Sequence, residues 1–162
     1  MTLFFVDVEA TGMSPASGQM TEFGAVNYDT LETFHGVLAE SEPDPITPAK
    51  PVITGEVYDP VPIMQDFDKW VRTTTKGRSI FVSDNPAYDF MWITTYFDST
   101  IGSSPFGHSG RRIGDFFAGM RGDWYASQAW KKWRVTPHDH NPVNDAMGNV
   151  EAFKRIMQEL NK

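Results

Sequence analysis

Short apolar runs separated by turns dominate the N-terminal quarter of the chain. Residues 3–8 and 23–28 are rich in β-branched and aromatic side chains, and residues 33–38 repeat this pattern after a tight Asp29-Thr30 connection. Runs of this length and composition predict strands, and the short connection predicts that the second and third form a hairpin. We therefore expect the start of the chain to be mostly sheet.

The middle of the chain alternates between loop and helix patterns. Residues 41–62 contain six prolines and few periodic apolar positions, which predicts a surface loop. Apolar residues at helical spacing from Ile63 to Val71 predict an amphipathic helix, and residues 80–82 predict a short buried strand. Glycines and serines in residues 99–110 predict a second loop.

Two Asn-Pro pairs predict helix starts, because asparagine suits the N-cap and proline the first turn. Asn85-Pro86 predicts a helix through Phe97, and Asn141-Pro142 predicts the helix that closes the chain. One face of the closing helix is apolar and carries Val150, Phe153, Ile156, Met157 and Leu160. The order of elements predicts an α/β protein whose sheet is mixed by the hairpin.

Length and composition restrict the class of protein. With 162 residues, 40% of them hydrophobic, the chain is long enough for one domain with a buried core, and we expect residues 1–162 to form it. We find no apolar run of about 18 residues and no signal-peptide pattern. We therefore expect a cytoplasmic protein with no membrane segment.

Composition also restricts the chemistry. Because the chain has no cysteine, any metal must be held by carboxylates or histidines, which favours hard cations such as Mg²⁺ or Mn²⁺. The net charge of −7 disfavours a polyanionic partner in general. Cations bound to a group of acids would nevertheless make that one site locally positive.

Asp7 and Glu9 are the first candidates for such a site. They end the first strand, and side chains alternate along a strand, so both carboxylates emerge on the same face. Two like charges side by side repel each other unless a cation lies between them. The pair therefore indicates either a metal site or a solvated strand end.

Three further candidates stand near the predicted helix starts. Asp89 lies in the first turn of one helix, where the helix dipole also favours an acid. Asp145 lies one turn into the last helix, and His140 comes just before that helix. A histidine there is often only a surface or capping residue, but these side chains could converge with the strand carboxylates.

Taken together, three segments resemble the motifs of the DEDDh 3′-5′ exonuclease family. Residues 5–15, followed by residues 22–26, resemble its first motif, and residues 85–89 resemble its second. Residues 140–145 have the H-x-x-x-x-D spacing of its third. The family includes polymerase proofreading exonucleases, ribonuclease T and oligoribonuclease. The resemblance implies an α/β, ribonuclease H-like fold with a central, mixed five-stranded sheet flanked by helices.

The resemblance implies hydrolysis of the terminal phosphodiester at the 3′ end of single-stranded DNA or RNA, which releases nucleoside 5′-monophosphates. Two Mg²⁺ or Mn²⁺ ions, roughly 3.5 to 4 Å apart, would act on the attacking and leaving oxygens. The implied metal ligands are Asp7, Glu9, Asp89 and Asp145, with Asp7 shared. His140 would take the proton of the attacking water, a role that suits imidazole at neutral pH.

The family also implies where the terminal nucleotide binds. The residues after the first acidic pair correspond to Ala10, Thr11, Gly12 and Met13, and the second motif adds Asn85. Gly12 would permit close approach of the backbone. Met13 could pack on the last base or simply belong to the core.

Some positions depart from the family or leave two interpretations open. Asp84 stands where relatives often have histidine or a small residue, so it adds an acid near the site. His138 precedes Asp145 by seven residues and misses the family spacing, so we prefer His140 as the base. Residues 130–134 interleave tryptophans with cations, which suits either contact with a single strand or a solvated helix face with the tryptophans packed inward.

Two other functions remain compatible with the sequence. One is a nucleic-acid-binding domain that has lost catalysis, and the other is a phosphodiesterase for dinucleotides and short oligonucleotides. Residue spacing does not separate DNA from RNA, because that choice depends on contacts to the 2′-hydroxyl. Some relatives act as dimers, so a homodimer is also compatible with the sequence.

Overall fold

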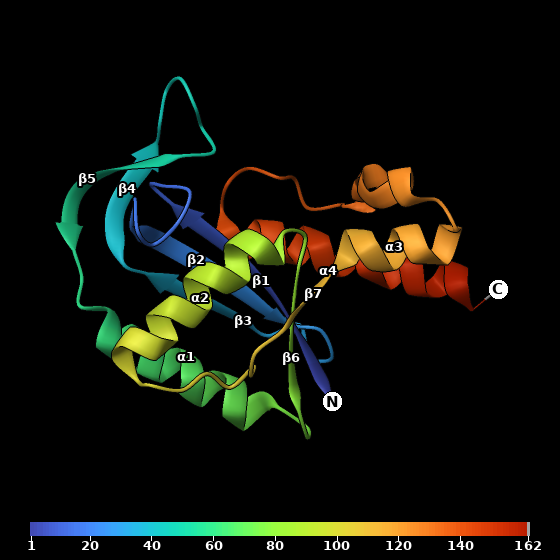
Figure 1. Cartoon of the computed structure of the whole chain (residues 1–162), viewed down its shortest axis with the longest axis horizontal. Coiled ribbons are helices and arrows are strands. Elements are labelled where there is room, and N and C mark those ends of the chain that lie inside the picture. Colours follow the sequence, from blue (N-terminus) through green and yellow to red (C-terminus); the bar gives the residue numbers. More distant parts are fainter. Residues whose placement is uncertain (162) are drawn as a thin grey trace.

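A five-stranded central sheet dominates the computed structural model, which describes residues 1–161 (Figure 1). In sheet order its strands are β3 (Thr33–Val37), β2 (Met20–Asn27), β1 (Thr2–Ala10), β6 (Ser79–Ser83) and β7 (Gly110–Arg112). β2 runs antiparallel to both of its neighbours, whereas β6 runs parallel to both β1 and β7. The mixed, five-stranded sheet that the family resemblance implies is confirmed.

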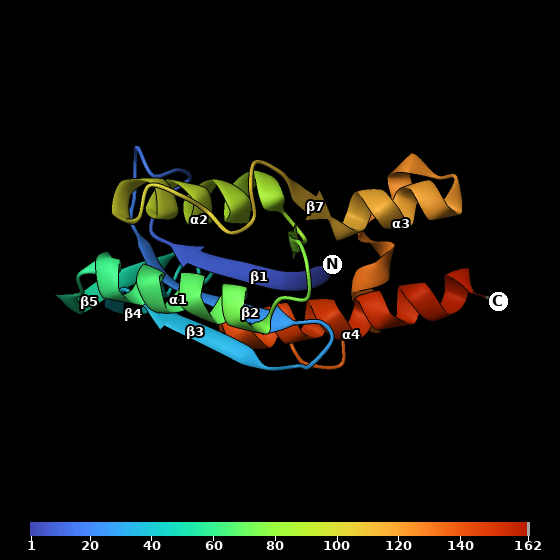
Figure 2. The same cartoon turned by 90° about the horizontal axis from the view of Figure 1, so that it is seen from below.

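Helices cover both faces of this sheet. The core on one face is made with α1 (Pro60–Thr74) and α2 (Pro86–Thr100). The core on the other face is made with α3 (Ile113–Arg121), the 3₁₀ helix η1 (Trp124–Trp133) and α4 (Pro142–Leu160). In both views, α1 and α2 lie toward one end of the molecule and α3 toward the other (Figures 1 and 2). None of these helices, within residues 1–161, is long and apolar enough to cross a membrane.

Alternation along β1 decides which face the strand carboxylates occupy. Phe4 and Val6 belong to the core under α1 and α2, whereas Phe5 belongs to the core under α3 and α4. Asp7 and Glu9 are two and four residues from Phe5, so they share its face. The two carboxylates therefore emerge on the side of the sheet that α4 covers.

The helix starts agree in part with the sequence prediction. The side chain of Asn141 accepts hydrogen bonds from the backbone N–H groups of Val143 and Asn144, as expected for an N-cap. Asn85 occupies the corresponding position of α2, but its side chain makes no capping hydrogen bond. That helix begins at Pro86, as predicted, and continues past Phe97 to Thr100.

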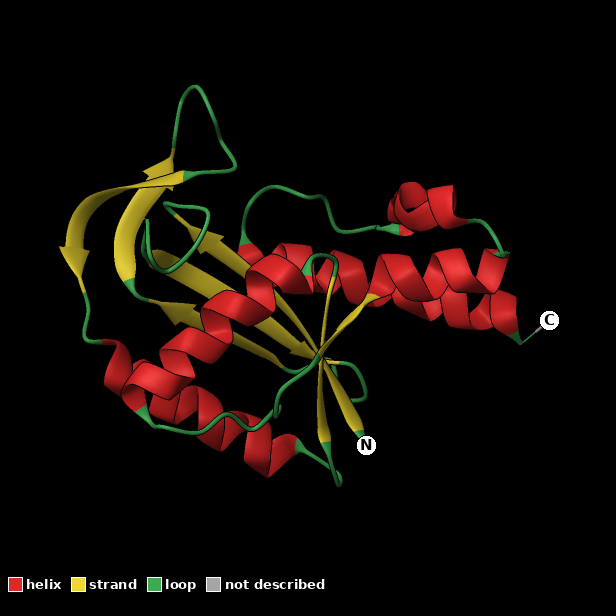
Figure 3. Ribbon diagram, viewed as in Figure 1, coloured by secondary structure: helices red, strands yellow, loops and turns green. Residues whose placement is uncertain are grey.

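The predicted surface loop at residues 41–62 is wrong in part. Most of it belongs to a hairpin of β4 (Ala39–Pro43) and β5 (Pro51–Val57), drawn in Figure 3 as a pair of strands beside the central sheet. Pro43 pairs with Pro51 at the end of the ladder next to the tip. Prolines at such an end cost few ladder hydrogen bonds, so the hairpin forms despite them.

Residues 99–134 also contain structure that the sequence pattern missed. The predicted loop gives way at Gly110 to the three-residue strand β7 and then to α3. Gly122 follows helix α3, and its φ of 62° is the left-handed conformation common after a helix. η1 then crosses toward the start of α4 and supplies the buried Trp130 to the core.

Gly24 on β2 lets the first turn of α4 approach the sheet. A β-carbon at this position would overlap the backbone of Pro142 and Val143. Only glycine leaves room for this contact. The start of α4, which carries Asp145, is therefore held directly against the strand beside β1.

Candidate active site

Four carboxylates from three elements converge beside a cavity of about 400 Å³. Asp7 and Glu9 come from β1, Asp89 from the first turn of α2 and Asp145 from the first turn of α4. All four carboxylates are buried, and all of them except Asp145 line the cavity. The convergence that the sequence left open is therefore present.

This carboxylate cluster fits a divalent cation. Asp7, Glu9 and Asp145 each offer a ligand atom, and these atoms lie within 4.8 Å of one another. Asp89 Oδ2 is buried and finds no hydrogen-bond partner within residues 1–161. A buried carboxylate oxygen without a partner is costly unless a proton or cation satisfies it. Oxygen-only donors of this kind suit Mg²⁺ or Mn²⁺.

Burial and mutual repulsion make the cluster unfavourable when all its members are ionised. Burial raises the pKa of Asp7 well above its ordinary value, and the charges of Asp89, Asp145 and Glu9 add to the effect. Burial, followed by Asp145 and Glu22, raises the pKa of Glu9 to about 8. Burial and Asp84 raise the pKa of Asp89 in the same way. Bound cations would reverse these shifts by favouring the ionised carboxylates.

The segment before α4 carries the two histidines and is anchored to that helix. The backbone N–H of Asp139 donates to Asp145 Oδ1 at 3.2 Å, and Asp139 Oδ2 accepts from the side-chain amide of Asn144 at 2.9 Å. Because Asp139 is tied to the helix in this way, its neighbours His138 and His140 are held over the cavity, which both of them line.

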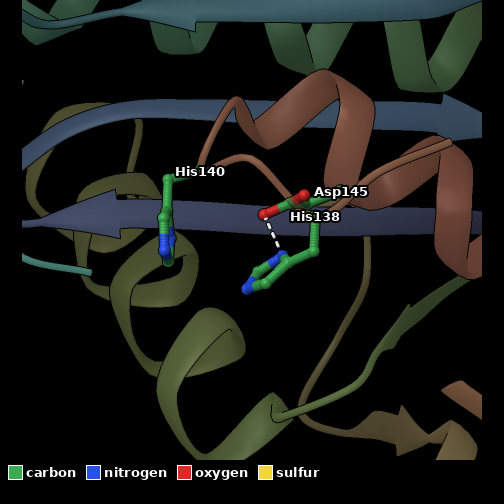
Figure 4. A group of neighbouring side chains, drawn as sticks. All are labelled: His138, His140 and Asp145. Carbon is green, nitrogen blue, oxygen red and sulfur yellow. Dashed lines mark ion pairs between the residues drawn. The ribbon is translucent and has the colours of Figure 1, made fainter. Parts of the chain in front are cut away.

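The two imidazoles approach different carboxylates. His138 Nδ1 lies 2.5 Å from Asp145 Oδ2 (Figure 4). His140 Nδ1 lies 3.6 Å from Glu9 Oε1. Their ring centroids are 4.7 Å apart. His140 also has a left-handed backbone with a φ of 61°, which non-glycine residues adopt uncommonly. Both histidines are therefore within reach of the cluster, and the preference for His140 as base stays a prediction.

The segment predicted to hold the terminal nucleotide follows β1 and is tied to α2. The hydroxyl of Tyr88 donates to the carbonyls of Gly12 at 3.2 Å and Ala10 at 3.4 Å. Burial, followed by the charge of Glu9, raises the pKa of Tyr88 to about 12, so the hydroxyl stays a donor. Sequence reasoning overlooked Tyr88, although its place immediately before Asp89 was a usable signal.

The other residues predicted to contact substrate differ in exposure. Met13 is 71% exposed, which removes the core alternative and leaves its side chain free to contact a base. Thr11 is partly buried, and its hydroxyl accepts a hydrogen bond from the backbone of Gln19. Asn85 is exposed and lines the cavity.

Residues 130–134 divide between the core and the cavity. Trp130 is buried, and Trp133 packs edge-on against Phe117, so the tryptophans face inward. Lys131 instead lines the cavity and forms an ion pair with Asp84. The sequence did not predict this cationic partner for Asp84.

Comparison with known proteins gives one curated relative and several solved structures. The chain is 29% identical over 167 residues to the 3′-5′ DNA exonuclease Cap18 of Escherichia coli, an overlap that covers 93% of this chain and 89% of that protein. No model of a known protein family matches the chain.

Complexes of E. coli exonuclease I are among the similar solved structures. Its zinc-bound complex with single-stranded DNA superposes with a TM-score of 0.55 at 18% identity, covering 97% of this chain and 39% of that one. Its complex with a dA16 oligonucleotide gives a TM-score of 0.56 at 15% identity, covering 98% and 42%. The chain thus spans about two-fifths of exonuclease I, and the likeness shows a shared fold.

These likenesses agree with the ordered motifs and with the converged carboxylates. The relative aligns over nearly the whole chain, and the fold is the one that the motifs implied. The acids of the three motifs meet at one buried cluster. In its ordered motifs, its fold and its relative, the chain is therefore similar to the DEDD-type 3′-5′ exonucleases.

Proposed function

We propose that this chain, as a single exonuclease domain of residues 1–162, removes nucleotides stepwise from the 3′ end of single-stranded DNA. The observation that carries the proposal is the convergence of four buried carboxylates beside a cavity lined by two histidines. It is supported by the relative Cap18, a 3′-5′ DNA exonuclease, and by the exonuclease I complexes with single-stranded DNA, dA16 and dT13.

The carboxylates would hold the catalytic cations. Asp7, Glu9 and Asp145 have ligand atoms close enough to share one ion, and the unpartnered oxygen of Asp89 would serve a second. When bound, two divalent ions such as Mg²⁺ or Mn²⁺ would stabilise the attacking and leaving oxygens of an in-line displacement. The charges of Asp89, Asp145 and Glu9 all raise the pKa of Asp7, so Asp7 lies close to each of the other acids. This position suits a carboxylate that binds both cations.

His140 would accept the proton of the attacking water. The water oxygen would bond to phosphorus as the bond from phosphorus to the 3′-oxygen breaks, and the 3′-oxygen would take a proton from solvent to become the new 3′-hydroxyl of the shortened strand. The released nucleotide would keep its phosphate on the 5′ carbon. The segment around Asp139 holds His140 over the cavity, near Glu9. His138 would hold the carboxylate of Asp145 in place through their ion pair. His138 would not accept the proton of the water.

The terminal nucleotide would bind beside the end of β1. Tyr88 fixes the backbone of Ala10 and Gly12 by two hydrogen bonds, which gives that segment a defined shape. The exposed side chain of Met13 would pack on the last base. Asn85, which lines the cavity, would also contact the nucleotide.

Degradation of 5′-labelled single strands tests the proposal. DNA and RNA of matched sequence are incubated with Mg²⁺ or Mn²⁺, and we expect a DNA ladder that shortens from the 3′ end. Asp89→Asn should abolish the ladder, whereas Asp98→Asn, an exposed acid on the same helix, should leave it intact. His140→Asn is the suitable histidine variant, because asparagine tolerates the left-handed backbone while lacking imidazole.

The same assay separates the competing functions. Strands that stay intact with every metal, yet bind, would indicate a binding domain. Rapid cleavage of dinucleotides with slow cleavage of longer strands would indicate a short-oligonucleotide phosphodiesterase. An RNA ladder in place of a DNA ladder would overturn the DNA preference alone.

A further inference from the structure

The cavity beside the carboxylates is also lined by cationic side chains. Besides the acids and histidines, the lining residues include Gln128 and Lys131, which lie three residues apart on η1. A 3₁₀ helix has about three residues per turn, so residues at this spacing lie on the same side. Among the residues that line this cavity, the lysine and arginine side chains are those of Lys131 and Arg112.

Asp84 forms ion pairs with two cations that differ in exposure. Arg134 donates to Asp84 Oδ2 at 3.3 Å and also to Asn149 Oδ1, and its side chain is only 9% exposed. Lys131 Nζ lies 2.8 Å from the same Asp84 oxygen, with its side chain 39% exposed. Arg134 is therefore a fixed structural partner that stays beside Asp84 when Lys131, the more exposed of the two cations, turns away.

The second cation that lines the cavity is already committed. Arg112 donates to the backbone carbonyl of Asp84 at 3.1 Å and to the carboxylate of Asp115 at 3.1 Å. These contacts fix its guanidinium at the junction of β6 and α3. Lys131 is thus the lining cation that can turn toward a ligand, and its flexible stem suits contact with a phosphate as a point charge.

A strand with its 3′ end in this site brings more than one phosphate. The scissile phosphate would be served by cations on the four carboxylates, as proposed above. The next phosphate on the 5′ side would lie outside that cluster and face a chain of net charge −7. It therefore needs a positive side chain of its own, and Lys131 stands next to Asp84, directly after β6, the strand beside β1.

We propose that Lys131 leaves Asp84 on substrate binding and contacts the phosphate one linkage 5′ to the scissile bond. The inference rests on the proposed function and names the strand contact of that same site. Arg134 keeps its contact with Asp84 after Lys131 has left, so the carboxylate retains one cationic partner. Of the cation-rich segment at residues 130–134, a single residue then touches substrate, while the tryptophans serve the core.

A cycle of enzyme and substrate changes tests this contact. The substrates are a DNA decamer and the same decamer with a neutral methylphosphonate in place of the phosphodiester one linkage 5′ to the scissile bond. The enzymes are wild type, Lys131→Gln and Lys132→Gln, all with saturating Mg²⁺. Lys132 is the matched control, because it is exposed, lies over the Trp133 ring and does not line the cavity.

We expect the methylphosphonate and Lys131→Gln each to lower kcat/KM about tenfold, the effect of one lost charge-assisted hydrogen bond. Because both changes remove the same contact, the pair should cost about tenfold rather than about a hundredfold. For Lys132→Gln the methylphosphonate should keep its full effect. Multiplying effects in Lys131→Gln, or no effect of the variant, would overturn the contact. A wild type that cleaves neither decamer would instead overturn the proposed function.

Discussion

Replacing Glu9 by glutamine should stabilise the metal-free protein at alkaline pH. Glu9 is only 7% exposed, and burial together with Asp145, Glu22 and Asp89 raises its pKa from 4.5 to about 8. A carboxyl with a higher pKa in the folded than in the unfolded protein binds its proton more tightly when folded. Its ionisation therefore destabilises the fold.

The size of this effect follows from the two pKa values. Stability falls as the pH rises above 4.5, and the loss is complete once the pH exceeds about 8. At about 1.4 kcal/mol per pH unit, the interval corresponds to roughly 5 kcal/mol. The raised pKa values of Asp7 and Asp89 act with the same sign. Glu9→Gln removes the contribution of one carboxyl. Its free energy of unfolding should therefore exceed that of wild type by an amount that grows with pH, to roughly 5 kcal/mol.

Urea unfolding followed by tryptophan fluorescence measures this difference between pH 5 and 9 in the presence of EDTA. Glu56→Gln, at an exposed glutamate of β5, serves as the control that removes a charge away from the cluster. Added Mg²⁺ should stabilise wild type most at high pH and narrow the gap. A wild type whose stability does not fall with pH, or a variant with the same pH slope as wild type, would refute the reasoning.

Three more predictions follow from the contacts around the site. Gly24→Ala should lower stability by a few kcal/mol and reduce activity, because the added methyl displaces the start of α4, whereas Gly119→Ala, with no atom within 4 Å of the new carbon, should not; urea unfolding and turnover assays check both. Asp139→Ala should lower kcat about tenfold at an unchanged half-saturating Mg²⁺ concentration, since it frees the histidine segment; a metal titration of activity would show a shifted midpoint if this is wrong. EDTA should abolish cleavage and Mn²⁺ should restore it, as followed by strand degradation.

The sequence predicted those parts of the fold in which local pattern and burial agree. β1 and α4 have strong apolar periodicity and clear ends, so both were found. β4 and β5 were missed because they are largely exposed and carry prolines, so neither alternation nor composition marks them. β7 has only three residues and depends on pairing with β6, which no local signal reports.

The candidate site divides in the same manner. The motif acids and His140 could be predicted because each motif is a short segment whose residue spacing can be read directly from the sequence. Tyr88 and Lys131 matter through partners far along the chain, namely Gly12 and Asp84, so only the folded structure places them. His138 was set aside on spacing, although the structure brings it to Asp145, because Asp139 fixes both neighbouring histidines at once.

Mass analysis of the products formed in ¹⁸O-enriched water is the most direct test of 3′-to-5′ hydrolysis by this site. A single-stranded DNA of defined sequence is incubated with Mg²⁺ and either wild type or Asp7→Asn, and the products are identified over time. We expect wild type alone to release nucleoside 5′-monophosphates in order from the 3′ end, each carrying one ¹⁸O in its phosphate. Nucleoside 3′-monophosphates, internal fragments, or equal release by Asp7→Asn would contradict it.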